Sequence, residues 1–120
     1  MKIIKGDLIL NKDTTFNESI IVKGSIKCDR LKVTGDIYAE NIDAENIDAW
    51  DIYAENIDAK DINARNIDAE NIDAENINAW EINARNIDAE NINARNIYAE
   101  NIDARVIDAL IKFMRGDNDD

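Results

Sequence analysis

Residues 41–55 read NIDAENIDAWDIYAE, three copies of a five-residue unit with isoleucine in its second position and alanine in its fourth. The unit repeats without a gap over residues 36–110, so isoleucine recurs at every fifth position from Ile37 to Ile107. Alanine follows each isoleucine by two, from Ala39 to Ala109. A repeat of fixed short period is the signature of a solenoid, in which each unit buries its apolar residues against its neighbours.

A helix does not explain this pattern. Each residue of an α-helix turns the chain by about 100°, so a five-residue spacing would scatter the isoleucines around the helix axis. In an extended strand, Ile42 and Ala44 point to one side and Asp43 points to the other. Because the next isoleucine is an odd number of residues away, the chain must turn once in each pentad to bring it back inside.

The position before each isoleucine fits such a turn, because it is mostly Asn or Asp and these residues tolerate turn conformations. We therefore predict an all-β fold, a single-stranded β-solenoid (β-helix) with five-residue sides. Successive coils are expected to lie about 4.8 Å apart in parallel register.

The pentads of residues 36–110 resemble those of the pentapeptide-repeat proteins, which form four-sided, right-handed β-helices. The resemblance implies a right-handed coil. The order of the residues differs, because that family places its small residue two positions before the central apolar residue, whereas here Ala44 follows Ile42. The surface residues of this sequence therefore have to decide the number of sides.

A three-sided coil stacks residues 15 apart, and a four-sided coil stacks residues 20 apart. At a spacing of 15 the aspartates and the asparagines form uniform columns, the three repeat tyrosines share one column, and both tryptophans share another. At a spacing of 20 each of these columns becomes mixed. The columns are Asp43, Asp58, Asp73, Asp88 and Asp103; Asn41, Asn56, Asn71, Asn86 and Asn101; Tyr38, Tyr53 and Tyr98; and Trp50, Arg65, Trp80, Arg95 and Leu110. They favour a triangular coil of 15 residues. A four-sided coil of 20 remains the alternative, because duplication of a 15-residue unit would give the same columns.

The residues outside the repeat are expected to form the two ends of the solenoid. Residues 1–35 contain three apolar-x-Gly-x-apolar units and predict an irregular, β-rich N-terminal cap and first coils. These units, such as Val-Lys-Gly-Ser-Ile at 22–26, resemble the bactofilins, polymer-forming proteins with three-sided β-helices. At the other end, residues 109–115 break the pentad and predict a short helix, so that residues 111–120 form a helical cap end and a disordered acidic tail.

Composition excludes most enzymatic chemistry. The 120 residues include no histidine and a single cysteine, Cys28, which excludes His-based catalysis, a Cys/His zinc site and an intrachain disulfide. The repeats contain no serine or threonine, and convex solenoid walls offer no cleft in which a carboxylate pair would be desolvated. We expect no enzyme activity, no cofactor, no metal site and no small-molecule substrate.

The net charge of −12 argues against direct binding to nucleic acid or to an anionic membrane. No stretch is long and apolar enough for a signal peptide or a membrane span, so a soluble, cytoplasmic protein is expected. The charge is uneven: the pentads that carry Ile37 and its equivalents total −7, those of Ile42 total −6, and those of Ile47 only −1.

Three groups of residues are candidate functional features. The asparagine column is expected to form a structural ladder of side-chain amides. The aspartate column predicts an acidic, solvated surface, in preference to a calcium site. Trp50, Arg65, Trp80, Arg95 and Leu110 predict a cation–π stack or an association surface, and Phe113 and Met114 predict either a lid on the last coil or a dimer contact.

The sequence therefore predicts a non-enzymatic structural or protein-interaction module. Its expected partner is itself, as a dimer or an end-to-end assembly, or another protein. The alternative is an acidic DNA mimic that inhibits a DNA-binding enzyme. The resemblance to pentapeptide-repeat proteins implies this alternative, because some of them occupy the DNA-binding groove of type II topoisomerases.

Overall fold

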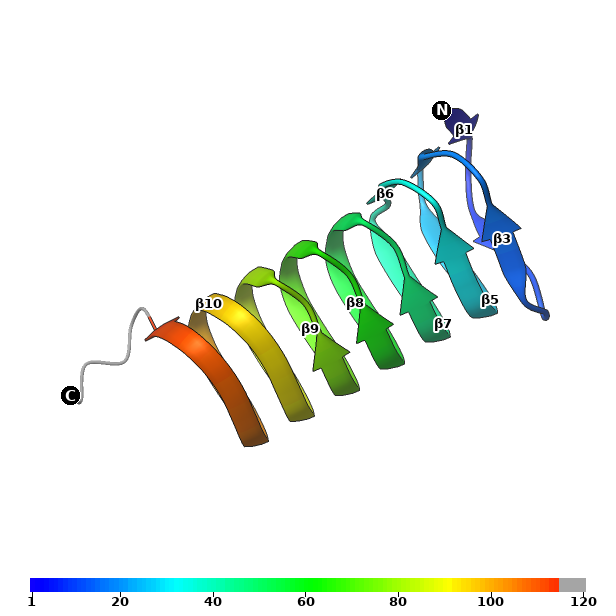
Figure 1. Cartoon of the computed structure of the whole chain (residues 1–120). Helices are drawn as coiled ribbons and strands as arrows, with labels where there is room; N and C mark the ends of the chain where they lie inside the picture. The colour runs from blue at the N-terminus through cyan, green and yellow to red at the C-terminus, as the bar shows by residue number, and fades with distance from the viewer. Residues whose placement is uncertain (115–120) are drawn as a thin grey trace.

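The computed structural model describes the backbone of residues 1–114 and the side chains of residues 1–109. These residues form a ten-stranded parallel sheet that coils around a narrow interior (Figure 1). The strands are β1 (Lys2–Ile4), β2 (Leu8–Ile9), β3 (Thr14–Phe16), β4 (Ile20–Val22), β5 (Ser25–Val33), β6 (Ile37–Tyr38), β7 (Asn41–Asp48), β8 (Asp51–Asn63), β9 (Asn66–Asn78) and β10 (Glu81–Met114). The predicted all-β solenoid is confirmed.

The register of the sheet gives the length of a coil. In β7 and β8 Asn41 lies opposite Asn56, and Asn56 lies opposite Asn71 of β9. Asn71 in turn lies opposite Asn86 of β10. Every pair is fifteen residues apart, so a coil holds three pentads, and the alternative of a 20-residue coil is excluded.

The interior of the solenoid consists of the isoleucine and alanine positions of the pentads. Every pentad isoleucine from Ile37 to Ile97 is at most 2% exposed, and most of the alanines are buried beside them. The residue between each isoleucine and alanine is exposed, as the period-two pattern predicts. Burying an isoleucine side chain contributes about 1.5–3 kcal/mol, and this contribution recurs in every pentad.

The N-terminal coils are longer than those of the repeat. Lys2 lies opposite Ile20, eighteen residues later, and Thr14 lies opposite Leu31, seventeen residues later. The spacing is sixteen where Ser25 faces Asn41, and it becomes fifteen from β6 onward. Residues 1–35 therefore enter the same parallel sheet as the pentads, and the coil shortens stepwise until it matches three units.

One glycine marks the place where the repeat begins. Gly35 has a φ of +151°, which disfavours other residues, and a Cβ at this position would meet the side chain and backbone of Ser19. The hydroxyl of Ser19 accepts a 2.9 Å hydrogen bond from the backbone N–H of Asp36. The glycine thus lets the first pentad pack closely on the coil beneath it.

The C-terminal helix predicted for residues 109–115 does not occur in the described residues, because β10 continues as a strand to Met114. The sequence offers a reason: Ile107, Ala109, Ile111 and Phe113 alternate at period two, and β-branched and aromatic residues favour strands. The rest of that segment, including the predicted acidic tail, lies outside the described residues.

Candidate functional site

The three pentads of each coil give the solenoid three sets of outward-facing residues. The first face consists of the pentads that begin at residues 36, 51, 66, 81 and 96, and the second of those that begin at 41, 56, 71, 86 and 101. The third face consists of those that begin at 46, 61, 76, 91 and 106. Residues at the same place in successive pentads of one face lie fifteen apart and form a column, which is named below after its first residue.

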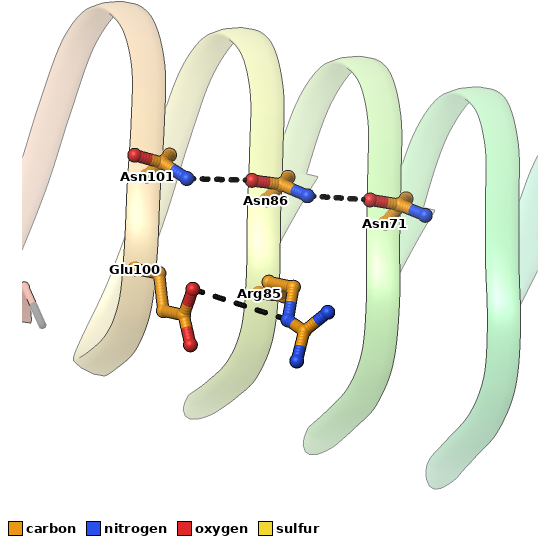
Figure 2. Close-up of polar contacts among 5 residues, drawn as sticks. All are labelled: Asn71, Arg85, Asn86, Glu100 and Asn101. Atoms are coloured by element: carbon orange, nitrogen blue, oxygen red, sulfur yellow. Dashed lines mark hydrogen bonds and ion pairs between the residues drawn. The ribbon is translucent and has the colours of Figure 1, made fainter. Parts of the chain in front are cut away.

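The Asn41 column forms an amide ladder along the second face. Figure 2 shows Asn101 donating its Nδ2 group to Oδ1 of Asn86, which donates in turn to Asn71, each at 2.8 Å. The same 2.8 Å bond continues through Asn56 to Asn41. Each Nδ2 group points toward the N-terminus, and the Oδ1 atoms of Asn41 to Asn86 each accept from the following coil. The ladder therefore fixes the register of one coil on the next.

The N-terminal end of this ladder is closed by a serine. The Nδ2 group of Asn41 donates to Oγ of Ser25 at 3.1 Å. The backbone N–H of Ser25 donates to Oδ1 of Asp7 at 2.9 Å, which joins the first coil to the network. The polar chain thus runs from the first coil to the last pentads of the second face.

A second ladder on the third face was not predicted from the sequence. Asn91 donates to Asn76, and Asn76 donates to Oδ1 of Asp61, each at 2.8 Å. With its amide turned to donate, Asn46 reaches Oδ2 of Asp61, also at 2.8 Å. Asp61 therefore accepts amide bonds from the coils on both sides of it. Because this column mixes asparagine and aspartate, its composition did not single it out.

The Trp50 column forms an alternating aromatic and cationic stack. The guanidinium carbon of Arg65 lies 4.9 Å from the ring centroid of Trp50 and 5.7 Å from that of Trp80. Arg95 lies 5.4 Å from the ring of Trp80 on the next coil. The two indoles keep large exposed fractions, 47% for Trp50 and 55% for Trp80. The stack is therefore a ridge that still presents aromatic surface.

A smaller aromatic stack lies on the first face. The rings of Tyr38 and Tyr53 lie 4.7 Å apart between centroids, with 11° between their planes. Tyr98 belongs to the same column but is separated from this pair by Asp68 and Asn83. On the same face, Nε of Arg85 lies 3.9 Å from a carboxylate oxygen of Glu100 (Figure 2).

The Asp43 column borders an acidic groove along the second face. The groove has a volume of about 720 Å³, and the buried alanine column beginning at Ala44 forms its floor. Its other wall is a mixed column, Glu45, Lys60, Glu75, Glu90 and Arg105. The uniform wall of the groove is thus the row of carboxylates in the Asp43 column.

The carboxylates of this row act on one another. The pKa of Asp58 is raised above its ordinary value of 3.8, first because partial burial disfavours the charged form and then because Asp73 and Asp43 carry the same charge. Away from the row, burial raises the pKa of the Cys28 thiol to about 11, with smaller contributions from nearby aspartates. Cys28 is therefore a buried, protonated thiol at neutral pH.

The remaining predicted interface residues, Leu110, Phe113 and Met114, lie outside the described side chains. Among residues whose side chains are described, no group of three His, Cys, Asp or Glu is placed to hold a metal ion. The described part of the chain likewise holds no helix of the length and apolarity that a membrane span requires. Comparison of the chain with family models, curated proteins and solved structures gave no match.

Proposed function

We propose that this protein is a non-enzymatic structural module, a rigid β-solenoid that associates with further copies of itself. The observation that carries the proposal is the open edge at the N-terminal end. Within the described residues, β1 pairs only with β4, whereas β2 and β3 pair only with β5. The outer edges of these strands therefore present unpaired backbone groups, which are templates for pairing with another chain.

The exposed apolar side chains and the charge of the N-terminal segment support the same proposal. Ile3 and Ile9 of the first coil are 58% and 61% exposed, and Met1 is 68% exposed. Residues 1–35 carry a charge of +3, whereas residues 36–110 carry −14. A second copy would cover exposed apolar side chains, and the basic end of one copy attracts the acidic repeats of another.

The proposal includes the shape of the coil. We infer a triangular, right-handed solenoid in which each pentad forms one side. The support for three sides is the 15-residue register, which gives each coil three isoleucines and three alanines. The support for the hand is the resemblance of the pentads to right-handed pentapeptide repeats. A crystal structure would test both.

The test of self-association is the molar mass of the purified protein in solution. Sedimentation velocity and light scattering from micromolar to millimolar concentration should show species above the 13.6 kDa of one chain. A single monomeric mass over this whole range would overturn the proposed function. If larger species form, electron microscopy of the concentrated protein distinguishes closed dimers from longer assemblies.

A second candidate function is mimicry of DNA by the acidic surface. The Asp43 column supports it, because it sets one aspartate on each coil; burial and then the like charges of Asp73 and Asp43 raise the pKa of Asp58. A charge of −14 spread over five coils of about 4.8 Å amounts to about one charge per 1.7 Å, as in duplex DNA. A gyrase supercoiling assay that shows no inhibition at micromolar protein would exclude it.

A further inference from the structure

We infer that the third face is the contact surface for a second copy of this chain. The two solenoids lie side by side and point in the same direction, and they are related by a twofold axis parallel to both. This inference rests on the proposed self-association and adds a lateral contact to the pairing proposed for the open edges of β1, β2 and β3. The argument uses the charges of the three faces, the exposed tryptophans and the pairing of residues that the twofold axis would impose.

Charge first separates the three faces. The first and second faces total −7 and −6, and the third totals −1. Two copies that approach through either acidic face repel each other, and this repulsion is much smaller on the third face. The third face also holds both tryptophans of the protein, half exposed beside a cation. Tryptophan, tyrosine and arginine are the residues most enriched where interfaces draw their binding energy, and the third face combines two of them in one column.

Each pentad of a face presents three outward positions: the first, the third and the fifth. A twofold axis parallel to the solenoid, centred on the third position, brings the first position of one copy opposite the fifth position of the other at the same height. It also brings the third position of one copy opposite the third position of the other. The sequence of each face can therefore be tested for compatibility with this arrangement.

On the third face the opposed residues complement each other. Asp61 is the acidic residue among the first positions, and it comes opposite Arg65 of the second copy, twice in each dimer. In the coil before, Trp50 meets Asn46, and in the coil after, Trp80 meets Asn76. The one acidic first position therefore meets a cation, and no first or fifth position of this face meets a like charge.

The residues that would lie on the twofold axis, the third positions of the pentads, also favour a contact through the third face. The column that would meet itself on the third face is Asp48, Asn63, Asn78, Asn93 and Asp108. Its three central members are amides, which both donate and accept hydrogen bonds, and the two carboxylates lie at the ends. On the second face the equivalent column is the five aspartates of the Asp43 column, so five like-charged pairs would meet on the axis.

The first face fails for a related reason. There the twofold axis would set Asp36 opposite Glu40 and Asp51 opposite Glu55, pairs of like charge. An antiparallel pair through the third face, at full overlap, would set Arg65 opposite Arg95. The parallel arrangement through the third face avoids both conflicts.

The groups needed for the contact are already held in place. Asp61 is fixed by amide bonds from the coils above and below it, and Arg65 is held between the two indoles. Neither forms a salt bridge within 4.0 Å to any other described residue. A shallow furrow of about 410 Å³ runs beside the Asn46 column from Asp61 to Val106, and the ridge of the second copy would face it.

The size of the face predicts a weak contact. Five coils of about 4.8 Å and a pentad of about 16 Å give each copy a flat area of roughly 400 Å², half of the area per partner in a standard stable interface. We therefore expect a dissociation constant of tens of micromolar or more, and a strong dependence on charge.

The test uses two charge reversals, Asp61→Lys and Arg65→Glu, measured by sedimentation velocity. Alone, each places like charges in both contacts and should weaken dimerisation at least tenfold. Mixed in equal amounts, the two variants should form a heterodimer at about the wild-type concentration, because each contact then pairs opposite charges. Repair within one chain cannot produce this result, since each variant chain carries a single change.

Two controls carry the same charge changes on the second face. Glu75→Lys matches Asp61→Lys, and Lys60→Glu matches Arg65→Glu. Neither should weaken dimerisation as the third-face variants do, and circular dichroism should show that all four variants keep the β-sheet signal. A dimer that the mixture fails to restore, or that Glu75→Lys disrupts as strongly as Asp61→Lys, would overturn the third-face contact.

The remaining outcomes separate the hypotheses. If Arg65→Glu alone strengthens the dimer, the copies pack antiparallel with Arg95 opposite position 65, and the parallel arrangement is wrong. If the wild-type protein remains monomeric at every concentration, the proposed function itself fails. If it assembles in a way that none of these variants changes, self-association stands and this surface is wrong.

Discussion

The Nδ2 group of Asn86 donates a 2.8 Å hydrogen bond to Oδ1 of Asn71, the residue that occupies the same place one coil earlier. Because each asparagine both donates and accepts, a single side chain links three coils. The register of the parallel sheet is therefore fixed on the surface as well as in the core.

Replacing Asn71 with alanine should destabilise the solenoid by about 1–2 kcal/mol, because the change removes one bond to Asn56 and one from Asn86. Urea unfolding followed by circular dichroism measures the effect. Asn83→Ala is the matched control, since this exposed asparagine makes no side-chain hydrogen bond to a described residue. Equal losses in the two variants would contradict a stabilising role for the ladder.

Replacing Ile72 with alanine should cost about 2–5 kcal/mol, because the side chain is 2% exposed and its loss leaves a cavity inside the coil. The same change at Ile102, which is only partly buried, should cost clearly less. Thermal unfolding of both variants gives the comparison. A larger loss at Ile102 would show that stability is concentrated at the C-terminal end and not in the central coils.

The Trp50 column predicts a measurable contribution from Arg65. Arg65→Gln keeps a polar side chain but removes the guanidinium group and its charge, and each exposed cation–π contact is worth about 0.5–1 kcal/mol. The variant should lose about 1 kcal/mol of stability, and the fluorescence of the two tryptophans should change. Arg85→Gln removes only an exposed 3.9 Å ion pair with Glu100 and serves as control. A loss at position 85 as large as that at 65 would contradict the stack.

The Asp43 column predicts a specific dependence of stability on pH. The pKa of Asp58 is higher in the folded protein than its ordinary value, so the folded state takes up this proton more readily than the unfolded chain. The stabilisation that results is fully present below the unfolded pKa and is lost as the pH rises through the folded one. Asp58→Asn should therefore stabilise the protein at pH 7, by no more than about 0.5 kcal/mol because the group is largely exposed.

The same difference should vanish near pH 3, where wild-type Asp58 is protonated, and it should shrink in high salt. Asp68→Asn makes the same charge change in a column where its neighbours, Tyr53 and Asn83, carry no charge. Stability curves measured from pH 3 to pH 8 for both variants test the cause. An equal gain from Asp68→Asn would attribute the effect to net charge instead of to the aspartate column.

Cys28 should react slowly with thiol reagents. Its pKa of about 11 leaves only about one thiolate in a thousand at pH 8, whereas an ordinary cysteine is about one quarter ionised there. The reaction with a disulfide reagent should be at least about 100-fold slower in the native protein than in denaturant. A native rate close to the denatured rate at pH 8 would show that the thiol is neither buried nor perturbed.

The sequence by itself determined the class of fold and the content of the core. The five-residue spacing of Ile and Ala requires an extended chain that turns once per pentad, because no helix aligns such residues on one face. The uniform Asp43 and Asn41 columns also indicated the 15-residue coil, since residues that stack on one another share an environment. Local alternation and stacking period are properties of the order of residues, and they can be read without coordinates.

Only the tertiary structure decided the rest. It showed that the N-terminal segment joins the same sheet in coils that shorten stepwise to fifteen residues. The sequence of residues 1–35 has no constant repeat length from which these pairings of 16–18 residues could be predicted. It extended β10 to Met114, where local helix signals compete with strand pairing. It also made Asp61 the acceptor for two coils, because these contacts join residues that only the closed coil brings together.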